Sequence, residues 1–318
     1  MKIIVNIPAY NEEKNIGDVI KSIPKTIEWY EILVQVVDDG SKDNTIKVSK
    51  EAWVNIVLEH EFNKWVWWAF KTAVDNFLKL QADIMVNIDA DGQFDVNDIQ
   101  KLVKPIINHE SDIVIGSRFS WKKADGIPFI KSFLNRVIAG FVWVLMMKKI
   151  DDLTCWFRAY NRESLLRLNL IETFTYTQET IIDWFGKWLR ISWIPISVKY
   201  FQNRKSRVVK TITSYIARSM MIILRTVRDV KPLTFFWLPW VLLIFFGLVL
   251  FWVFLYNYLQ VFQTTPYRTW LIISATSVSI WLLLFVFASI ADMIKWQRKI
   301  SEETLYQVKK FIFDNNKK

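Results

Sequence analysis

The chain of 318 residues contains few cysteines and histidines, and these shortages limit what it can be. Its single cysteine, Cys155, excludes a disulfide framework and a zinc site with several cysteine ligands. We expect this thiol to be a small apolar filler. We expect the two histidines, His60 and His109, to be surface residues rather than ligands. Residues 1–8 are too short an apolar run for a signal peptide, so the N-terminal part is expected to remain in the cytoplasm.

Glycine is also scarce, because 8 glycines stand beside 17 tryptophans. An average chain has about 7% glycine, which would be roughly 22 residues here. Residues 63–69, between a predicted strand and a predicted helix, contain three of the tryptophans. A membrane protein rich in tryptophan is the alternative, since tryptophan is favoured at membrane interfaces. That alternative accounts for Trp237, Trp240 and Trp270.

It does not account for tryptophans in predicted soluble turns. These are Trp65, Trp67, Trp68, Trp156 and Trp188. We hypothesise that many of them are glycines in the native protein, encoded by UGA in a lineage that reads this codon as glycine.

The net charge of +10 is concentrated beside long apolar segments. Residues 233–258 carry no charge and 270–291 form a second apolar segment, and a bilayer is spanned by about 20 such residues. Basic residues precede the first segment and follow the second, which predicts both ends in the cytoplasm. Residues 206–230 have apolar residues at helical spacing and predict an amphipathic helix on the membrane surface. A basic nucleic-acid-binding protein is an alternative, but no recognition motif is present.

Apolar runs alternate with helical patterns in the first two thirds of the chain. Strands are predicted at 2–7, 31–37, 55–58, 84–88 and 112–115, and helices at 12–23, 43–52, 68–80 and 96–108. This alternation predicts an α/β fold with a mostly parallel sheet covered on both faces. We therefore predict a catalytic domain at 1–205, an amphipathic juxtamembrane helix at 206–231, two transmembrane helices within 232–294 and a charged cytoplasmic tail at 295–318. Its last part, Lys309–Lys318, is expected to be solvated.

Polar clusters follow the three main strands, where ligands bind in open α/β sheets. Asp89 and Asp91 are two residues apart after the strand at 84–88, and Gln93 follows. Carboxylate oxygens are preferred ligands of Mg²⁺ or Mn²⁺, which bridge diphosphate oxygens. Such an ion stabilises a departing nucleoside diphosphate. An Asp-x-Asp pair in a loop can also be a solvated turn.

Two further clusters complete a pattern: Pro8-Ala9-Tyr10-Asn11-Glu12-Glu13 and Val37-Asp38-Asp39-Gly40-Ser41. With them the sequence resembles the inverting GT-A glycosyltransferases of family two, which have a Rossmann-like fold. The likeness is to polyprenyl-phosphate sugar synthases, and it covers about residues 1–205. The resemblance implies transfer of a sugar from a nucleotide-sugar to a polyprenyl phosphate, with Mg²⁺ or Mn²⁺ as cofactor. Nucleic acid is not an expected partner, whereas self-association is compatible with the membrane helices.

The resemblance also implies residue roles. The nucleotide would be bound by Pro8, Ala9, Tyr10, Glu12, Asp38, Asp39 and Asp89. The metal ion would be held by Asp89, Asp91 and Gln93. Catalysis would depend on Asp91, Arg118 and Glu179. The acceptor phosphate would be bound by Arg118, Asn135, Arg136, Arg204, Ser206 and Arg207.

Two other functions remain open at this point. A processive polysaccharide synthase of the same fold would carry a Gln-x-x-Arg-Trp motif and usually more spans, and the motif is absent from the sequence. A non-catalytic membrane scaffold could retain the fold, although the intact Asp89, Asp91, Gln93 and Arg118 argue against it.

Overall fold

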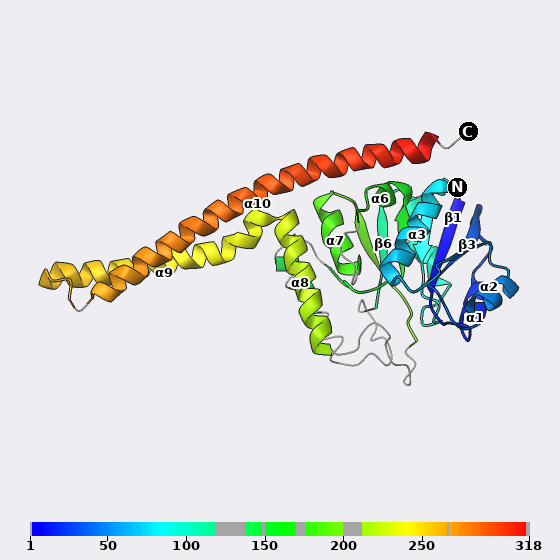
Figure 1. Ribbon diagram of the computed structural model, residues 1–318, viewed down its shortest axis with the longest axis horizontal. Coiled ribbons are helices and arrows are strands. Elements are labelled where there is room, and N and C mark those ends of the chain that lie inside the picture. Colours follow the sequence, from blue (N-terminus) through cyan, green and yellow to red (C-terminus); the bar gives the residue numbers. More distant parts are fainter. Residues whose placement is uncertain are drawn as a thin grey trace. The chain divides into compact units, whose positions relative to one another are not determined.

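The chain forms two compact units, drawn in Figure 1, whose elements are described separately below. The first unit contains Met1–Ile223 and Glu302–Lys318, and the second contains Leu224–Ser301. The computed structural model describes residues 2–118, 136, 138–140, 142–144, 146–147, 150–169, 176–199, 212–265 and 267–315.

The first unit is built on one sheet with helices beside it. The strands are β1 (Lys2–Ala9), β2 (Thr26–Ile27), β3 (Tyr30–Asp38), β4 (Ile56–Glu59), β5 (Ile84–Asn87), β6 (Ile113–Ser117), β7 (Arg158–Asn161) and β8 (Ile191–Pro195). The helices are α1 (Ile16–Ser22), α2 (Thr45–Glu51), α3 (Val66–Lys79), α4 (Asp98–Ile107), α6 (Arg162–Leu166) and α7 (Tyr176–Gly186).

The sheet has the order β2-β3-β1-β5-β7-β6-β8, and β4 pairs with β3. Parallel pairing joins β1 to β3 and β5, β3 to β4, and β6 to β8. The predicted mostly parallel α/β sheet is therefore confirmed. Sequence patterns did not show β7, which runs antiparallel between β5 and β6. Because β7 is antiparallel to both neighbours, β6 runs in the same direction as β5. The carboxyl ends of β1, β3, β5 and β6 thus share one edge of the sheet.

The core of this unit follows from the spacing of apolar residues. Strand β1 is buried along Ile3, Ile4 and Val5 without alternation, as expected for a strand covered on both faces. Helix α3 buries Phe70, Ala73, Val74, Phe77 and Leu78. This i, i+3, i+4 spacing places all of them on one helix face. Truncating a fully buried phenylalanine such as Phe77 to alanine costs about 3–5 kcal/mol.

A buried polar ladder fixes the register of the three central strands. Asn6 of β1 donates through Nδ2 to Asn87 Oδ1 of β5 at 2.7 Å. Gln35 of β3 donates through Nε2 to Asn6 Oδ1 at 3.1 Å, and Asn76 of α3 donates to Gln35 Oε1 at 2.6 Å. A strand slipped by one residue would leave these buried amides unpaired, which costs free energy. The ladder thereby aligns the strand ends that carry the predicted site.

The second unit contains α9 (Pro232–Val261) and much of α10 (Arg268–Asn315). Both helices are long and apolar enough to cross a membrane, with mean hydropathy of 2.6 and 2.3 in their most apolar windows. The buried share of the most apolar window is 18% in α9 and 17% in α10. A core helix of a soluble protein would be mostly buried. The helices approach closely at Gly247, whose carbonyl accepts a hydrogen bond of 2.8 Å from Ser274 Oγ. The two predicted membrane helices are confirmed as candidate spans.

Helix α10 is longer than the predicted second span, because it continues into the charged C-terminal residues. No glycine or proline interrupts it, so nothing in the local sequence breaks the helix. The preceding helix, α8 (Ile212–Val230), buries Ser219, Ile222 and Ile223 while Arg218 and Arg225 are exposed. It has the predicted amphipathic pattern, and its place on a membrane surface stays a prediction.

Candidate active site

The loops that follow β1 and β3 are tied together at the shared sheet edge. Ala9 is paired with Asp38 in the sheet register, so the predicted Pro8-Ala9-Tyr10 segment lies beside the predicted acidic pair. Asn11 N donates to Ser41 Oγ at 2.8 Å, and Lys42 N donates to Asn11 Oδ1 at 2.8 Å. Glu12 N donates to Thr45 Oγ1 at 2.8 Å. These reciprocal bonds bring the first two predicted clusters into one site.

Asp38 has a buried oxygen that can accept a ligand's hydrogen bond. Its Oδ2 accepts from Ser41 N at 2.9 Å, which forms the turn after β3. Its Oδ1 is buried without a hydrogen-bond partner among the described residues. Leaving a buried acceptor unsatisfied costs about 1–3 kcal/mol, and each such group in a folded protein calls for an explanation. A donor on a bound molecule would satisfy this atom.

Asp39 is held by residues that the sequence patterns did not assign to the site. His60 Nδ1 lies 2.7 Å from Asp39 Oδ1, and Lys64 N donates to the same oxygen at 2.9 Å. Because a carboxylate has no proton to donate, Nδ1 carries the hydrogen. His60 Nε2 lies 2.9 Å from Thr72 Oγ1 of α3. The expectation of a surface residue is therefore wrong for His60, whose side chain is 8% exposed, and right for His109.

The turn after β3 approaches the backbone of the segment that follows β4. A Cβ added to Gly40 would lie 2.6 Å from the carbonyl carbon of Phe62, and the φ of Gly40 is +73°. Both facts require glycine at this position. The close approach brings His60 and Lys64 onto Asp39. A polar residue directly after β4, the neighbour of β3, is the sequence signal that could have identified His60.

The predicted metal-binding residues follow β5, the strand on the other side of β1. Asp89, Asp91 and Gln93 are half-buried, and Asp91 Oδ1 accepts a hydrogen bond of 3.0 Å from Gln93 N. Within the described ranges, no three His, Cys, Asp or Glu side chains gather to form a metal site on their own. The loop therefore offers two carboxylates and one amide at the same edge as Asp38 and Asp39.

Arg118 lies at the end of β6, as predicted, but its guanidinium is held by an aspartate. Its Nε donates to Asp152 Oδ2 at 2.7 Å, and its Nη2 donates to Asp152 Oδ1 at 2.9 Å and to Thr154 Oγ1 at 2.6 Å. Asp152 is fully buried. This two-pronged geometry fixes the guanidinium plane. Sequence reasoning missed Asp152, because no local spacing relates it to a residue 34 positions earlier.

A buried arginine connects the turn after Asp152 to the helix that carries Glu179. Arg158 donates through Nε to Cys155 O at 2.7 Å, through Nη2 to Thr177 O at 3.0 Å, and through Nη1 to Thr180 Oγ1 at 3.0 Å. Glu179 lies between these contacts in the first turn of α7 and is 5% exposed. The turn also meets the third main strand, since Asn87 donates to Trp156 O at 3.3 Å. Glu179 is thereby fixed relative to the strand end that precedes Asp89.

Two further predicted residues, Glu12 and Arg136, lie in the described part of the chain. Arg136 is exposed. Glu12 Oε2 accepts a hydrogen bond of 3.2 Å from Asn15 Nδ2, which lies three residues along the chain. The predicted acceptor residues Asn135, Arg204, Ser206 and Arg207 lie outside the described residues.

Cys155 lies in the same turn and is an apolar filler, as predicted. It is fully buried, and burial raises the pKa of its thiol to about 12. A thiol with that pKa carries almost no thiolate near neutral pH, so it is not a nucleophile.

Comparison with known proteins identifies the family to which these strand-end residues belong. Residues 4–168 match the family model described as Glycosyl transferase family 2. The chain belongs to this family. The two predicted clusters, the Asp89–Asp91 loop and Arg118 all lie within the matched residues, so the predicted GT-A resemblance is confirmed and the protein is a glycosyltransferase.

Named relatives include lipid-phosphate sugar transferases. The chain is 33% identical to a UDP-N-acetylglucosamine–dolichyl-phosphate N-acetylglucosaminyltransferase of Methanococcus voltae, over 63% of this chain and 87% of the relative. It is 28% identical to a dolichol-phosphate mannosyltransferase of Pyrococcus furiosus, over 68% of this chain and 62% of the relative. These family 2 homologues transfer sugars to polyprenyl phosphates.

A solved structure shows the same fold. Glucosyl-3-phosphoglycerate synthase of Mycobacterium tuberculosis, crystallised with Mn²⁺, UDP-glucose and phosphoglyceric acid, aligns with a TM-score of 0.54 at 20% identity. The alignment covers 72% of this chain and 79% of that protein. At this identity the likeness shows the GT-A fold alone.

Proposed function

We propose that this family 2 glycosyltransferase moves a sugar from a UDP- or GDP-linked donor to a polyprenyl phosphate and inverts the configuration at the sugar. The observation that carries the proposal is the single sheet edge where Asp38, Asp39 and the Asp89–Asp91 loop meet, in a chain with two candidate membrane helices. The relatives that act on dolichyl phosphate support a lipid acceptor for this chain.

The donor's nucleoside would lie against the loops after β1 and β3. Asp38 Oδ1, which is buried without a partner among the described residues, can accept from an N–H of the base or a ribose hydroxyl. Asp39 is oriented by His60 and the Lys64 amide through Oδ1. Pro8, Ala9 and Tyr10 would line the same pocket.

The residues after β5 fit a divalent cation. Asp89, Asp91 and Gln93 provide hard oxygen ligands, and their half-buried positions leave access from solvent. Mg²⁺ or Mn²⁺ bound there would neutralise charge on the departing diphosphate. The hydrogen bond from Gln93 N to Asp91 Oδ1 orients one carboxylate before any ion binds.

The acceptor needs positioning rather than a strong base, because a phosphate monoester is already ionised at neutral pH. Arg118 is paired with Asp152, so we assign it to orienting the acceptor side. It would do so through the turn at Thr154, which its guanidinium holds. Glu179 would lie near the transferred sugar, on the side from which the acceptor approaches. Catalysis then depends on alignment and charge stabilisation.

The membrane arrangement completes the proposal. Both chain ends and the catalytic unit would be cytoplasmic, since basic residues flank the two candidate spans. Retention at the membrane raises the local concentration of a lipid acceptor.

A transfer assay tests the proposal. Membranes with the protein are given labelled UDP-glucose, UDP-N-acetylglucosamine or GDP-mannose, with undecaprenyl or dolichyl phosphate and Mn²⁺ or Mg²⁺. Lipid-extractable label that EDTA abolishes is the expected result. No label with any donor, from protein that is folded, contradicts the proposal.

The metal-binding role has a sharper test. Asp91→Ala is expected to abolish transfer while the protein stays folded. Asp91→Asn keeps an oxygen for the Gln93 amide and removes the charge, so it should also fail. Asp95→Asn is the matched control, because Asp95 is exposed and its side chain bonds only the backbone and side chain of Asn97 among the described residues. Turnover near wild type in Asp91→Asn would contradict the metal-binding role.

A further inference from the structure

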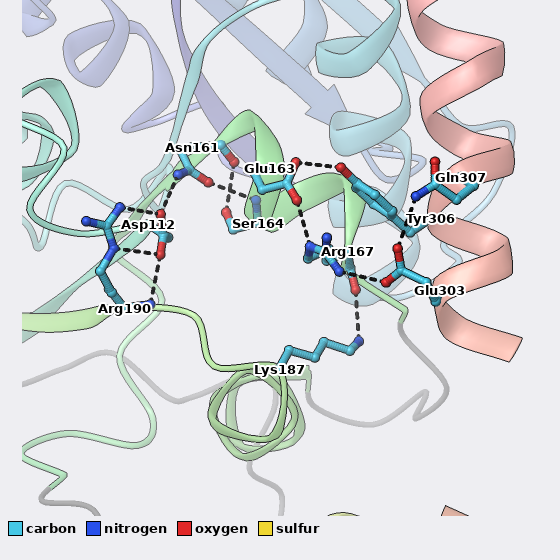
Figure 2. Close-up of polar contacts among 10 residues, drawn as sticks. All are labelled: Asp112, Asn161, Glu163, Ser164, Arg167, Lys187, Arg190, Glu303, Tyr306 and Gln307. Atoms are coloured by element: carbon cyan, nitrogen blue, oxygen red, sulfur yellow. Dashed lines mark hydrogen bonds and ion pairs between the residues drawn. The ribbon is translucent and has the colours of Figure 1, made fainter. Parts of the chain in front are cut away.

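The C-terminal end of α10 packs against the catalytic unit, although the sequence predicted a solvated tail. We call residues 302–315 the tail, and they belong to the first unit. Tyr306 of the tail is 6% exposed, and its hydroxyl donates to Glu163 Oε2 of α6 at 3.0 Å. Lys309 donates to Leu168 O at 2.6 Å and is largely buried, which lowers its pKa. The tail is therefore a docked element (Figure 2).

Arg167, just after α6, is central to this contact. Its Nε donates to Glu163 Oε1 at 2.6 Å, and its Nη1 donates to Glu303 Oε2 at 3.0 Å. Its guanidinium lies 4.0 Å from the centroid of the Tyr306 ring. One side chain thus joins a carboxylate of α6 to a carboxylate and an aromatic ring of the tail, as Figure 2 shows.

Lys187 links the tail to α7. Its Nζ donates to Asp183 Oδ2 at 2.6 Å and to Arg167 O at 2.8 Å, and it lies 3.3 Å from Glu302 Oε2. An ammonium group has three hydrogens, and three acceptors from three elements surround this one. The side chains of Lys187 and Asp183 are 12% and 6% exposed, so the contact is shielded from solvent.

The same helix face leads to the predicted active site. Glu179, Asp183 and Lys187 are spaced i, i+4 and i+8, so they lie along one side of α7 and its C-terminal end. Glu179 is in the first turn, where Arg158 anchors its neighbours. Helix α7, with 11 residues, is the element that links the two ends.

We propose that the tail is a positioning element for the acceptor side of the active site, with Lys187 as the positioning residue that connects it to Glu179. The expected change in turnover rests on the proposed transfer reaction. The expected change in the structure of α7 rests on the contacts alone. Donor binding at β1 and β3 involves none of these residues.

Full-chain variants test the connection. Lys187→Met keeps an unbranched apolar stem and removes the three donors of the ammonium group. Glu302→Gln removes only the charge that the tail contributes. Hydrogen exchange of residues 176–187 and steady-state kinetics for donor and acceptor are measured for both. Arg190→Gln is the matched control, because Arg190 forms an ion pair of 3.0 Å with Asp112 in the same unit, away from the tail.

We expect Lys187→Met to speed exchange in 176–187 and to lower turnover about tenfold, the size of effect that a small misplacement of a catalytic group produces. The donor KM should stay unchanged, and Glu302→Gln should show the same pattern more weakly. Arg190→Gln should leave exchange in α7 and turnover as in wild type. Unchanged exchange in Lys187→Met would overturn the proposal even if no transfer reaction is found. If the kinetic constants for donor and acceptor worsened equally, the cause would be a general loss of stability, and this result would also overturn the proposal.

A second inference rests on backbone angles. Three tryptophans have positive φ, with values of 66° at Trp53, 73° at Trp65 and 59° at Trp188. They are 88%, 63% and 85% exposed, so packing of the indole rings does not explain these conformations. At Trp65 the ψ of 156° places the residue in a region that is essentially restricted to glycine.

Trp53 and Trp188 occupy the position after a helix where glycine is usual. After α2, Val54 N donates to Ser49 O and Trp53 N donates to Lys50 O. After α7, Leu189 N donates to Trp184 O and Trp188 N donates to Phe185 O. Both sets of bonds form the Schellman motif, whose left-handed residue is most often glycine.

We infer that Trp53, Trp65 and Trp188 are glycines in the native protein. We extend the inference to Trp67 and Trp68, which follow Trp65 in the first turn of α3. The codon UGA, read as glycine in the source cells and as tryptophan in the printed sequence, would produce this substitution at every affected position. The segment after Lys64 would then be a glycine-rich entry into α3, beside the Lys64 amide that bonds Asp39.

Mass spectrometry of the protein from its native cells decides the question. Trypsin releases residues 51–64, which contain Trp53, and residues 65–71, which contain Trp65, Trp67 and Trp68. Fragment masses that fit glycine at these positions are expected. Fragment masses that fit tryptophan would overturn the inference. In recombinant protein, Trp65→Gly should raise the melting temperature, whereas Trp184→Gly at a fully buried position should lower it.

Discussion

The contact between His60 and Asp39 predicts that substituting His60 lowers both the stability of the protein and its affinity for the donor nucleotide, by different amounts. Asp39 Oδ1 accepts two hydrogen bonds, one from His60 and one from the Lys64 amide. His60→Leu removes the first. Hydrogen bonds to charged groups contribute about 1.5–3 kcal/mol to stability. For a unit of this size, that loss lowers the melting temperature by roughly 3–12 °C.

The effect on nucleotide binding is smaller, because it depends only on the cost of immobilising the Asp39 side chain. Without His60 the Asp39 side chain gains rotational freedom that the nucleotide must remove again. Immobilising one side chain costs about 0.5–1.5 kcal/mol. Since 1.4 kcal/mol is tenfold in affinity, the Kd for the nucleoside diphosphate should rise about two- to tenfold.

Calorimetric titration of UDP and GDP in the presence of Mn²⁺ measures this change. His60→Asn can donate from an amide nitrogen placed near the position of Nδ1, and it should restore most of the affinity. Thr72→Val removes the partner of Nε2 and should have a minor effect. An unchanged Kd in a less stable His60→Leu protein would refute the orienting role, as would an Asn variant as weak as the Leu variant.

Three further predictions follow from buried or paired groups. Asp152→Ala leaves the Arg118 guanidinium without its carboxylate and should lower the free energy of unfolding by about 3–5 kcal/mol, measured by denaturant titration; a loss below about 1 kcal/mol would show that the pair is dispensable. Burial would raise the pKa of Asp112, but hydrogen bonds from Arg190 and its charge hold that pKa below its ordinary value. The resulting stability is present above the unfolded carboxyl pKa and is lost as pH falls through the lowered folded value, so the difference in melting temperature between wild type and Arg190→Gln should shrink below about pH 4. Because the pKa of Cys155 is raised to about 12, iodoacetamide should not modify it at pH 8 until the protein unfolds, and rapid modification of the folded protein would contradict its burial.

The strands and their shared edge could be predicted because they depend on local patterns. Apolar runs such as 31–37 are long enough to identify buried strands, and the polar residues after them mark where the strands end. The parallel direction followed from the helices between the strands. Asp38, Asp39, Asp89 and Asp91 therefore lie at one edge, as the sequence indicated.

Contacts between distant segments could not be predicted in the same way. Strand β7 is four residues long and contains Arg158 and Asn161, which do not form an apolar run. Asp152 meets Arg118 across 34 positions. The tail has a mixture of charges that suits a solvated helix equally well, and only the tertiary structure shows that Tyr306 and Lys309 face α6.

These two kinds of contact correspond to the two sides of the proposed reaction. The donor side uses loops at the ends of adjacent strands, so the residues that determine it lie close to motifs in the sequence. In the proposed reaction, the acceptor side would depend on three contacts: Asp152 holds Arg118, Arg158 holds the first turn of α7, and Lys187 holds its other end. Substitutions far from any motif should therefore alter acceptor kinetics before they alter nucleotide binding. A tail variant that weakened nucleotide binding first would show instead that the two sides are not separable in this way.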